Sequence, residues 1–385
     1  MSEREISTIG AVLEARKLAM LALLSFGMAG CQTTSQLSVP LTTVTVPEEI
    51  AIAPPAPLLP LPQAPPTAPS AILHLPSSHV LPSAPRATWP TNWVNAWVPL
   101  EDWGRYNGLD KPIQVSSALA PSYQFHTTNG TMTVRMGSRV ALCNGLECWL
   151  GYAPQIIKGI PCIHWLDAQK SLQPLIDSPE YRFKSVRTIV LDPGHGGKDS
   201  GTRSALHTAS EKDYTLDWAL RLRQVLITNG WKVLLTRTND LDISLPERVA
   251  IAERAQADLF LSLHFNSGLP NQALAGVETY CLTPLGLPSN LVRDYEDNLQ
   301  HGFPNNAYDE QNFQIACRLH RFVVQSLCAV DRGVRRARFM GVLRGQNRPA
   351  VLIEAGYLSN PGEAKQIASA AYRQKLADAV AKALE

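Results

Sequence analysis

The second half of the chain alternates between short apolar runs and longer stretches in which apolar residues recur at helical spacing. The apolar runs predict buried strands at 188–191, 233–235, 259–264, 277–282 and 351–354. The helical periods predict helices at 210–228, 245–257 and 313–329. Such alternation is typical of an α/β fold, and we predict a mixed central sheet with helices on both faces for residues 186–385.

Residues 91–182 follow a different pattern, in which β-type runs flank two Asn-Gly pairs, Asn129-Gly130 and Asn144-Gly145. Asn-Gly supplies the positive φ angles of a type I′ turn, so each pair predicts a β-hairpin. We therefore expect a small β-rich domain ahead of the α/β domain. It is either a module that binds substrate or cell wall, or a spacer.

Proline marks the next segment towards the N-terminus. Residues 32–90 contain nearly half of the chain's 29 prolines, separated mainly by Ala, Ser, Thr and Leu. Such a segment lacks the periodicity that forms a packed core, and it predicts a semi-extended linker.

The N-terminal pattern is that of an export signal. The apolar run 18–30 follows Arg16 and Lys17 and is too short for a permanent membrane-spanning helix. It ends in small residues followed by Cys31, which resembles a bacterial lipoprotein cleavage site. We predict that 1–31 is a signal peptide with a lipobox and that Cys31 carries the lipid. The alternatives are a plain secretory signal, or a buried helix that is followed by a cysteine by chance.

Export would place the protein in the periplasm or cell envelope, and Gln32 favours the outer membrane if the source is Gram-negative. The seven cysteines then face an oxidising compartment, where Cys143 and Cys148 are the nearest candidates for pairing. All six cysteines other than Cys31 could equally be small buried residues. The formal net charge of +2 gives no basic footprint, so we expect no nucleic-acid partner.

Four polar side chains lie where predicted strands or helices begin or end. His195 follows the first strand, Glu211 begins the next helix, His264 ends the third strand and Glu354 ends the last. Two imidazoles and one carboxylate suit a catalytic zinc ion, which keeps its fourth position for water. A second carboxylate, for which Glu354 is the candidate, would transfer the proton from water to the leaving group.

Residues 187–385 resemble the zinc-dependent N-acetylmuramoyl-L-alanine amidases of the type-3 amidase family. The resemblance rests on motifs that span nearly all of this region, at 189–197, 211–222, 236–248, 257–266, 276–280 and 349–360. It implies that His195, Glu211 and His264 hold Zn²⁺ and that Glu354 is catalytic. The implied reaction is hydrolysis of the amide between N-acetylmuramic acid and L-alanine in peptidoglycan, for wall remodelling or cell separation.

Several expectations depend on less specific signals. Region 91–182 resembles the copper-amine-oxidase-N-terminal-like module of exported proteins, without a His/Cys cluster that would hold copper. Asn266 is a candidate substrate contact or a strand-end hydrogen-bonding residue. Arg237, Asp240 and Arg248 match positions of the family and are expected to pin a loop and a helix through charge-assisted hydrogen bonds, with a substrate contact as the alternative.

The long segment 283–312 could line a groove or lie in solvent. In some members of the family an inserted helix here blocks the zinc until a partner protein removes it, so an activator is a further hypothesis. Two other functions remain open for the chain: a non-catalytic peptidoglycan anchor, and a zinc peptidase acting on the stem peptide.

Overall fold

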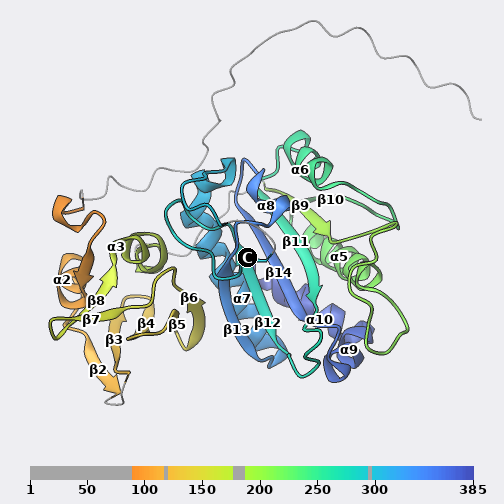
Figure 1. Cartoon of the computed structure of the whole chain (residues 1–385). Helices are drawn as coiled ribbons and strands as arrows, with labels where there is room; N and C mark the ends of the chain where they lie inside the picture. The colour runs from red at the N-terminus through yellow and green to blue at the C-terminus, as the bar shows by residue number, and fades with distance from the viewer. Residues whose placement is uncertain (1–88, 117–119, 177–186, 294–296) are drawn as a thin grey trace, which may run out of the picture. The chain divides into compact units, whose positions relative to one another are not determined.

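The central feature is one eleven-stranded sheet that runs from the C-terminal region into the β-rich region (Figure 1). The computed structural model describes residues 89–116, 120–176, 187–293 and 297–385. The signal peptide, Cys31 and most of the proline-rich linker lie outside these ranges. The strand order is β10-β9-β11-β14-β12-β13-β6-β5-β4-β3-β2.

The C-terminal half of this sheet is mixed, as the sequence predicts. Its strands are β9 (Thr188–Pro193), β10 (Lys232–Leu235), β11 (Leu259–Asn266), β12 (Val277–Cys281), β13 (Asp331–Arg336) and β14 (Ala350–Tyr357). Strands β10, β9, β11 and β14 are parallel neighbours, whereas β12 pairs antiparallel with β14. Because β14 continues to Tyr357, Glu354 lies inside its strand rather than at the end, which corrects the expectation from the apolar run.

Helices cover both faces of this part of the sheet, so the predicted α/β architecture is confirmed. The helical elements are α5 (Glu211–Thr228), α6 (Leu245–Arg254), η3 (Pro304–Tyr308), α7 (Asp309–Leu327), α8 (Gly341–Arg344), α9 (Pro361–Ala368) and α10 (Ala370–Ala383). Helices α5, α7 and α10 pack together over one face, and α6 and α8 pack over the other. The apolar run of strand β9 is continuous because both faces of the strand are buried. Ile189 and Leu191 belong to the core under α5, and Val190 belongs to the core under α6.

The β-rich region adds five strands to the long sheet and three to a small second sheet. Its elements are η1 (Thr91–Trp93), β1 (Trp97–Pro99), α2 (Leu100–Tyr106), β2 (Ile113–Ser116), β3 (Ser122–Thr127), β4 (Gly130–Arg135), β5 (Val140–Cys143), β6 (Leu146–Trp149), β7 (Gln155–Ile157), β8 (Ile160–His164), α3 (Trp165–Asp167), the π-helical η2 (Ala168–Leu172) and α4 (Gln173–Ile176). The small sheet has the order β1-β8-β7.

The two predicted hairpins are present, but only one has the predicted turn. Asn144 and Gly145 have φ angles of 55° and 81°, as a type I′ turn between β5 and β6 requires. In the β3–β4 hairpin, Thr127 pairs with Gly130. Asn129 therefore sits in the turn without a positive φ, and Gly130 already belongs to β4. The type I′ prediction was wrong there, because the strand register, which the dipeptide alone does not fix, places Gly130 outside the turn.

Strand β6 joins the β-rich region to the C-terminal region by pairing in parallel with β13 through Cys148 and Val334. We call the contacts around this pairing the seam. The backbone N–H of Glu147 donates to Asp331 (2.8 Å), and Arg336 donates to Ser171 Oγ (2.7 Å). The division into domains at 91–182 and 186–385 stays a prediction, since 177–186 lies outside the described residues.

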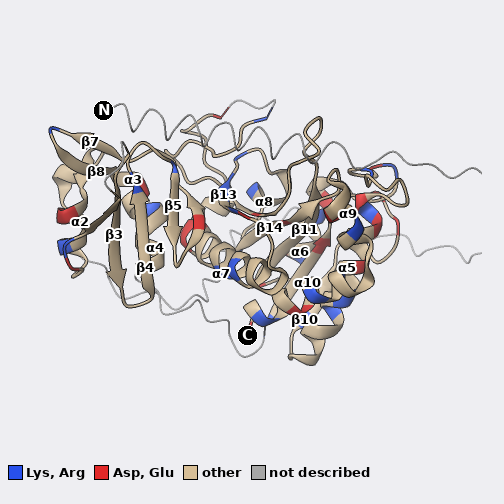
Figure 2. Cartoon of the chain, turned by 90° about the horizontal axis from the view of Figure 1, so that it is seen from below, with Lys and Arg blue, Asp and Glu red and all other residues tan. Residues whose placement is uncertain are grey.

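Charged positions of both signs are interspersed along α2 and α5 (Figure 2). Among the described helices, none is both long and apolar enough to cross a membrane.

Candidate metal centre

His195 lies on a glycine-rich loop that leaves β9 in an unusual backbone conformation. His195, Gly196 and Gly197 have φ angles of 62°, 131° and 59°, and consecutive positive φ angles favour glycine. Gly194 is required for a different reason, because a Cβ there would lie 2.2 Å from the ring of His264. The loop therefore turns His195 back towards β11, and a left-handed conformation at this non-glycine residue marks a strained position of the kind that gathers at functional sites.

Glu211 and His264 complete a group of three ligand-type side chains. Oε1 of Glu211 lies 3.1 Å from Nε2 of His195 and 2.9 Å from Nδ1 of His264. Backbone N–H groups fix the carboxylate from the other side, since Phe265 donates to Oε1 (3.1 Å) and Thr202 donates to Oε2 (3.0 Å). Capping explains the start of α5, where the Ser210 N–H donates to Asp213 (3.0 Å) and Glu211 becomes the first helical residue.

The three residues have the donor set and spacing of a metal site. One ligand atom from each of His195, Glu211 and His264 lies within 4.8 Å of the others. Burial lowers the pKa of His195, but the hydrogen bonds and charges of Glu211 and Asp199 outweigh this effect and raise the pKa to about 9. Burial opposes ionisation of Glu211, yet both histidines hold the pKa of that carboxyl well below its usual range. The ionised Glu211 carboxylate therefore favours positive charge at this position, and two nitrogens with one oxygen suit Zn²⁺.

Glu354 stands beside this group without a hydrogen-bond partner for one oxygen. It is the direct β-partner of His264 in the β11–β14 register. Its Oε2 is buried and receives no hydrogen bond from any described residue. Burial raises the pKa of Glu354 to about 7, and the charges of Glu211 and Glu278 act in the same direction. A carboxyl group with such a pKa exchanges protons near neutral pH.

Two buried arginines hold the His195 loop, as expected from the sequence. Arg237 donates to the carbonyl oxygens of Pro193 (3.0 Å) and Gly194 (2.8 Å) and to Thr215 Oγ1 (3.1 Å). Arg248 donates to the carbonyl oxygen of His195 (2.7 Å).

Arg248 also forms an ion pair with Asp192 (2.7 Å). Asp240, on the neighbouring loop, accepts from the N–H of Gly197 (2.7 Å) and pairs with Lys212 (2.6 Å). Charged groups thus hold the backbone of the loop at Pro193, Gly194, His195 and Gly197.

Asn266 is engaged by the protein itself. Its Nδ2 donates to Glu278 (3.0 Å), and its Oδ1 accepts from the N–H of Ser267 (2.8 Å). These contacts favour the strand-end alternative, and a contact between Asn266 and substrate stays a prediction.

Sequence reasoning missed two residues that shape the site. The carboxylate of Asp199 is hydrogen-bonded to Nδ1 of His195 (2.8 Å). In the sequence, the only sign of this role is that Asp199 follows the histidine by four residues. Glu278 faces Glu354 across β12 and β14, and it accepts from Tyr280 and Tyr357 (2.7 and 2.9 Å). Its signal was a lone acid inside an apolar strand.

Comparison with known proteins identifies the family. The model of the N-acetylmuramoyl-L-alanine amidase family matches residues 189–385. The chain belongs to this family. It is 33% identical over 199 residues to the uncharacterized protein YqiI of Bacillus subtilis (strain 168), which covers 52% of this chain and 84% of YqiI. It is 31% identical over 216 residues to the N-acetylmuramoyl-L-alanine amidase AmiA of Escherichia coli (strain K12), covering 51% of this chain and 74% of AmiA.

The chain is also similar to a solved structure. The catalytic domain of CwlV, an N-acetylmuramoyl-L-alanine amidase from Bacillus (Paenibacillus) polymyxa var. colistinus, is 30% identical and gives a TM-score of 0.43. The match covers 52% of this chain and 96% of that one. The predicted family, and with it the prediction of an enzyme of the amidase class, is confirmed by the family match.

Proposed function

We propose that this chain is a zinc-dependent hydrolase that cuts the amide between the lactyl group of N-acetylmuramic acid and L-alanine in peptidoglycan. The observation that carries the proposal is the position of Glu354 directly beside His264, at the edge of a group of three metal ligands. The family of the chain supports the choice of bond. Wall remodelling or cell separation is the corresponding role.

His195, Glu211 and His264 would hold the ion. A zinc ion bound there supplies Lewis-acid polarisation of the scissile carbonyl and makes a water molecule more acidic. Glu354 takes the proton of the attacking water and delivers it to the leaving amine of L-alanine, for which a pKa of about 7 is well matched. Arg237, Arg248 and Asp199 act through His195 by keeping its ring oriented.

The substrate places the protein outside the cytoplasm, in the cell envelope. We further propose that Cys31 carries a lipid that anchors the chain to a membrane, in line with the apolar run and small residues ahead of it. Incorporation of radiolabelled palmitate, lost in Cys31→Ala and kept in Cys328→Ala, tests the anchor independently of catalysis.

The decisive experiment digests a defined muropeptide with the purified chain and identifies the products by mass. The proposal expects two products: a muramic acid with a free lactyl carboxylate, and a stem peptide whose N-terminal L-alanine has a free amino group. It also expects loss of turnover with a chelator and recovery with Zn²⁺. Glu354→Gln should retain zinc and lower turnover by about 10²–10⁴-fold, whereas the exposed-site control Glu101→Ala should match the wild type.

Other products would establish one of the alternatives. A new amino terminus inside the stem peptide would make the chain a zinc peptidase. Binding of peptidoglycan with no cleavage at any zinc concentration would make it an anchor. Full turnover by Glu354→Gln would remove that residue from the mechanism while leaving the reaction in place.

A further inference from the structure

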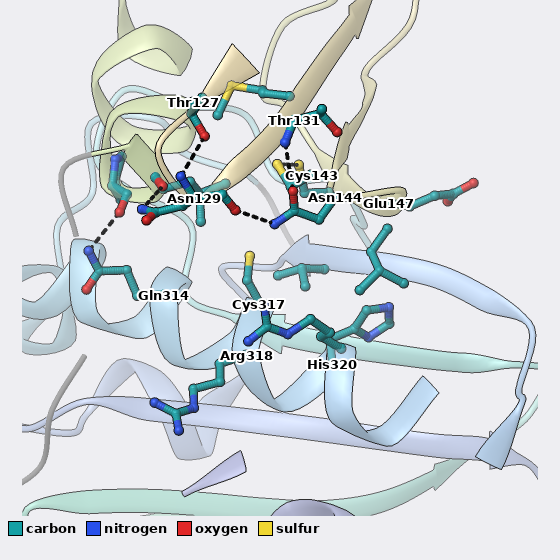
Figure 3. Close-up of a pocket in the computed structure, with 17 residues that line it drawn as sticks. Thr127, Asn129, Thr131, Cys143, Asn144, Glu147, Gln314, Cys317, Arg318 and His320 are labelled. Atoms are coloured by element: carbon teal, nitrogen blue, oxygen red, sulfur yellow. Dashed lines mark hydrogen bonds between the residues drawn. The ribbon is translucent and has the colours of Figure 1, made fainter. Parts of the chain in front are cut away.

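A cavity of about 310 Å³ lies at the seam, between the two Asn-Gly hairpins and helix α7 (Figure 3). Its wall includes three thiols: Cys143 on β5, Cys148 on β6 and Cys317 on α7. The Cys317 side chain points from α7 towards the hairpin, as Figure 3 shows. The metal centre does not use any of these residues.

Two of these thiols are already in contact. Sγ of Cys143 lies 3.1 Å from Sγ of Cys148. In the β5–β6 register Cys148 pairs with Ala141, two residues before Cys143. Because residues two apart in a strand face the same side, Cys143 and Cys148 are diagonal neighbours on one face of the hairpin.

The turn holds the two strands in this register. Asn144 and Gly145 adopt the positive φ angles of a type I′ turn. The Asn144 side chain accepts from the N–H of Thr131 (2.8 Å) and donates to the carbonyl oxygen of Asn129 (2.9 Å). The hairpin is therefore fixed at its tip by the neighbouring hairpin, and the two sulfur atoms are kept together rather than meeting by chance.

We propose that Cys143 and Cys148 form a redox-active dithiol that closes to a disulfide in an oxidising compartment, with the cavity giving an external disulfide access to the hairpin sulfur atoms. The oxidant is another disulfide, such as that of a thiol–disulfide oxidoreductase or of oxidised glutathione. Cys317 is not the partner, because the sulfur atoms of Cys143 and Cys148 are already in contact. The two strands that carry them are joined by one tight turn.

The exchange is balanced in two steps. One thiol of the pair, as its thiolate, attacks the external disulfide, forms a mixed disulfide and releases one external thiol. The second hairpin thiolate then attacks the protein sulfur of the mixed disulfide and releases the other external thiol. The pair has then lost two protons and two electrons, and the external disulfide has been reduced to two thiols.

Oxidation would act on the strand that joins the two regions of the chain. Cys148 is the residue of β6 that pairs with Val334 of β13. The backbone N–H of the neighbouring residue Glu147 donates a hydrogen bond to Asp331. A bond from Cys148 to Cys143 restricts opening of the hairpin and so keeps β6 in place for this pairing.

The test uses the reduced full-length chain, equilibrated with oxidised glutathione in mildly alkaline buffer. Such buffer favours reaction, since the hydrogen bond with Cys148 and burial raise the pKa of Cys143. After unfolding, free thiols are alkylated and the chain is digested with trypsin. The peptide 140–158 contains both hairpin cysteines and no other.

The proposal expects peptide 140–158 to carry no alkyl group and to be two hydrogens lighter than the reduced, unalkylated peptide. Cleavage after Glu147 should then leave its two parts joined until a reductant is added. Cys143→Ser should leave Cys148 without an intramolecular bond, either as the alkylated thiol or as its mixed disulfide with glutathione. The exposed-thiol control Cys328→Ser and Cys317→Ser should behave as the wild type. The wild-type measurement stands even if Cys143→Ser does not fold.

Two results would overturn the assignment. One is a peptide 140–158 that still carries both alkyl groups after equilibration with the oxidant. The other is a disulfide that joins either hairpin cysteine to Cys317 or to any other cysteine.

Discussion

At the level of single residues, the centre of the candidate metal site is a buried carboxylate that favours positive charge beside it. Glu211 is buried between two imidazoles, and without an ion the positive charge that it needs is a proton on His195. A zinc ligand must be neutral imidazole, so the ion and that proton compete for the same nitrogen lone pairs. This competition can be measured without reference to turnover.

We predict that zinc binding near neutral pH releases about one proton from His195. The pKa of this histidine is raised to about 9, so the metal-free protein carries the proton throughout the neutral range and loses it only above that pH. Titration calorimetry in two buffers with different ionisation heats counts the released protons. Asp199→Asn should release fewer, because Asp199 is one of the carboxylates that raise this pKa. Binding heats independent of the buffer would contradict the prediction.

Glu354 affects the stability of the fold, because its negative charge is costly to bury. Its pKa of about 7 in the folded protein exceeds its ordinary value, so between these two values the folded state binds more protons than the unfolded state. The stability contributed by the neutral carboxyl is present at low pH and is lost as pH rises towards 7 and beyond.

We therefore predict that metal-free Glu354→Gln gains stability relative to the wild type as the pH rises from about 5 to 8, by on the order of 2 kcal/mol. Urea titrations of both proteins at several pH values measure the difference in the free energy of unfolding. Equal pH dependence of the two proteins would show that Glu354 ionises freely in the fold.

At the level of elements, the loop after β9 is the feature that brings His195 to the other ligands. Arg237 satisfies two carbonyl oxygens of this loop and also donates to the carbonyl oxygen of Lys212 (2.8 Å) at the start of α5. One side chain thus joins the loop that carries His195 to the helix that carries Glu211. Residues 194–203 of the loop are glycine, polar or charged residues, so its position depends on these hydrogen bonds.

We predict that Arg237→Ala weakens zinc binding by about 10–100-fold, as loss of a group that orients a metal ligand does. Arg237→Lys should restore little, because an ammonium group cannot reproduce the planar set of guanidinium donors. Arg254→Ala is the matched control, since Arg254 is exposed on α6 and pairs only with Glu247 in the ion pairs described. Zinc affinity measured by competition with a chromophoric chelator decides the matter, and unchanged affinity in Arg237→Ala would contradict it.

The elements also show how far sequence pattern reaches. The ends of parallel strands meet at one edge of a sheet, so the strand pattern alone is enough to expect His195 and His264 together. Glu278 was missed because its place opposite Glu354 depends on the antiparallel pairing of β12 with β14. The Asn129-Gly130 turn was wrongly assigned because a dipeptide does not fix strand register. The extension of β14 past Glu354 also follows from its partners, since β11 runs on to Asn266 and pairs with Tyr357.

At the level of the whole described molecule, the seam makes the β-rich region and the C-terminal region share one sheet. A spacer domain on a flexible connection would have polar, hydrated contacts. Here Arg336 is buried, stacks on the ring of Phe313 at 4.0 Å and donates to the carbonyl oxygen of Lys170 (2.6 Å). Asn290 donates to the carbonyl oxygen of Leu150 (2.8 Å).

These contacts also locate part of the long segment 283–312. Arg139 of the β-rich region donates to the carbonyl oxygen of Ser289 (3.0 Å), and Tyr152 donates to that of Gly286 (3.2 Å). The segment is thus held by the region that precedes the C-terminal region in sequence. Whether a partner protein acts on it stays a hypothesis.

From the shared sheet we predict that the two regions unfold together. In a urea titration followed by hydrogen exchange, peptides from β4–β6 and from β11 should lose protection at the same urea concentration. Arg336→Met should separate the transitions and cost about 1–3 kcal/mol, because it removes the hydrogen bonds of a buried guanidinium to Ser171 Oγ and to the carbonyl oxygen of Lys170. Arg105→Ala, which changes an exposed arginine of the β-rich region, should leave a single transition. Two well-separated transitions in the wild type would mean that β6 and β13 meet without mutual stabilisation, and the β-rich region would then be an independent spacer.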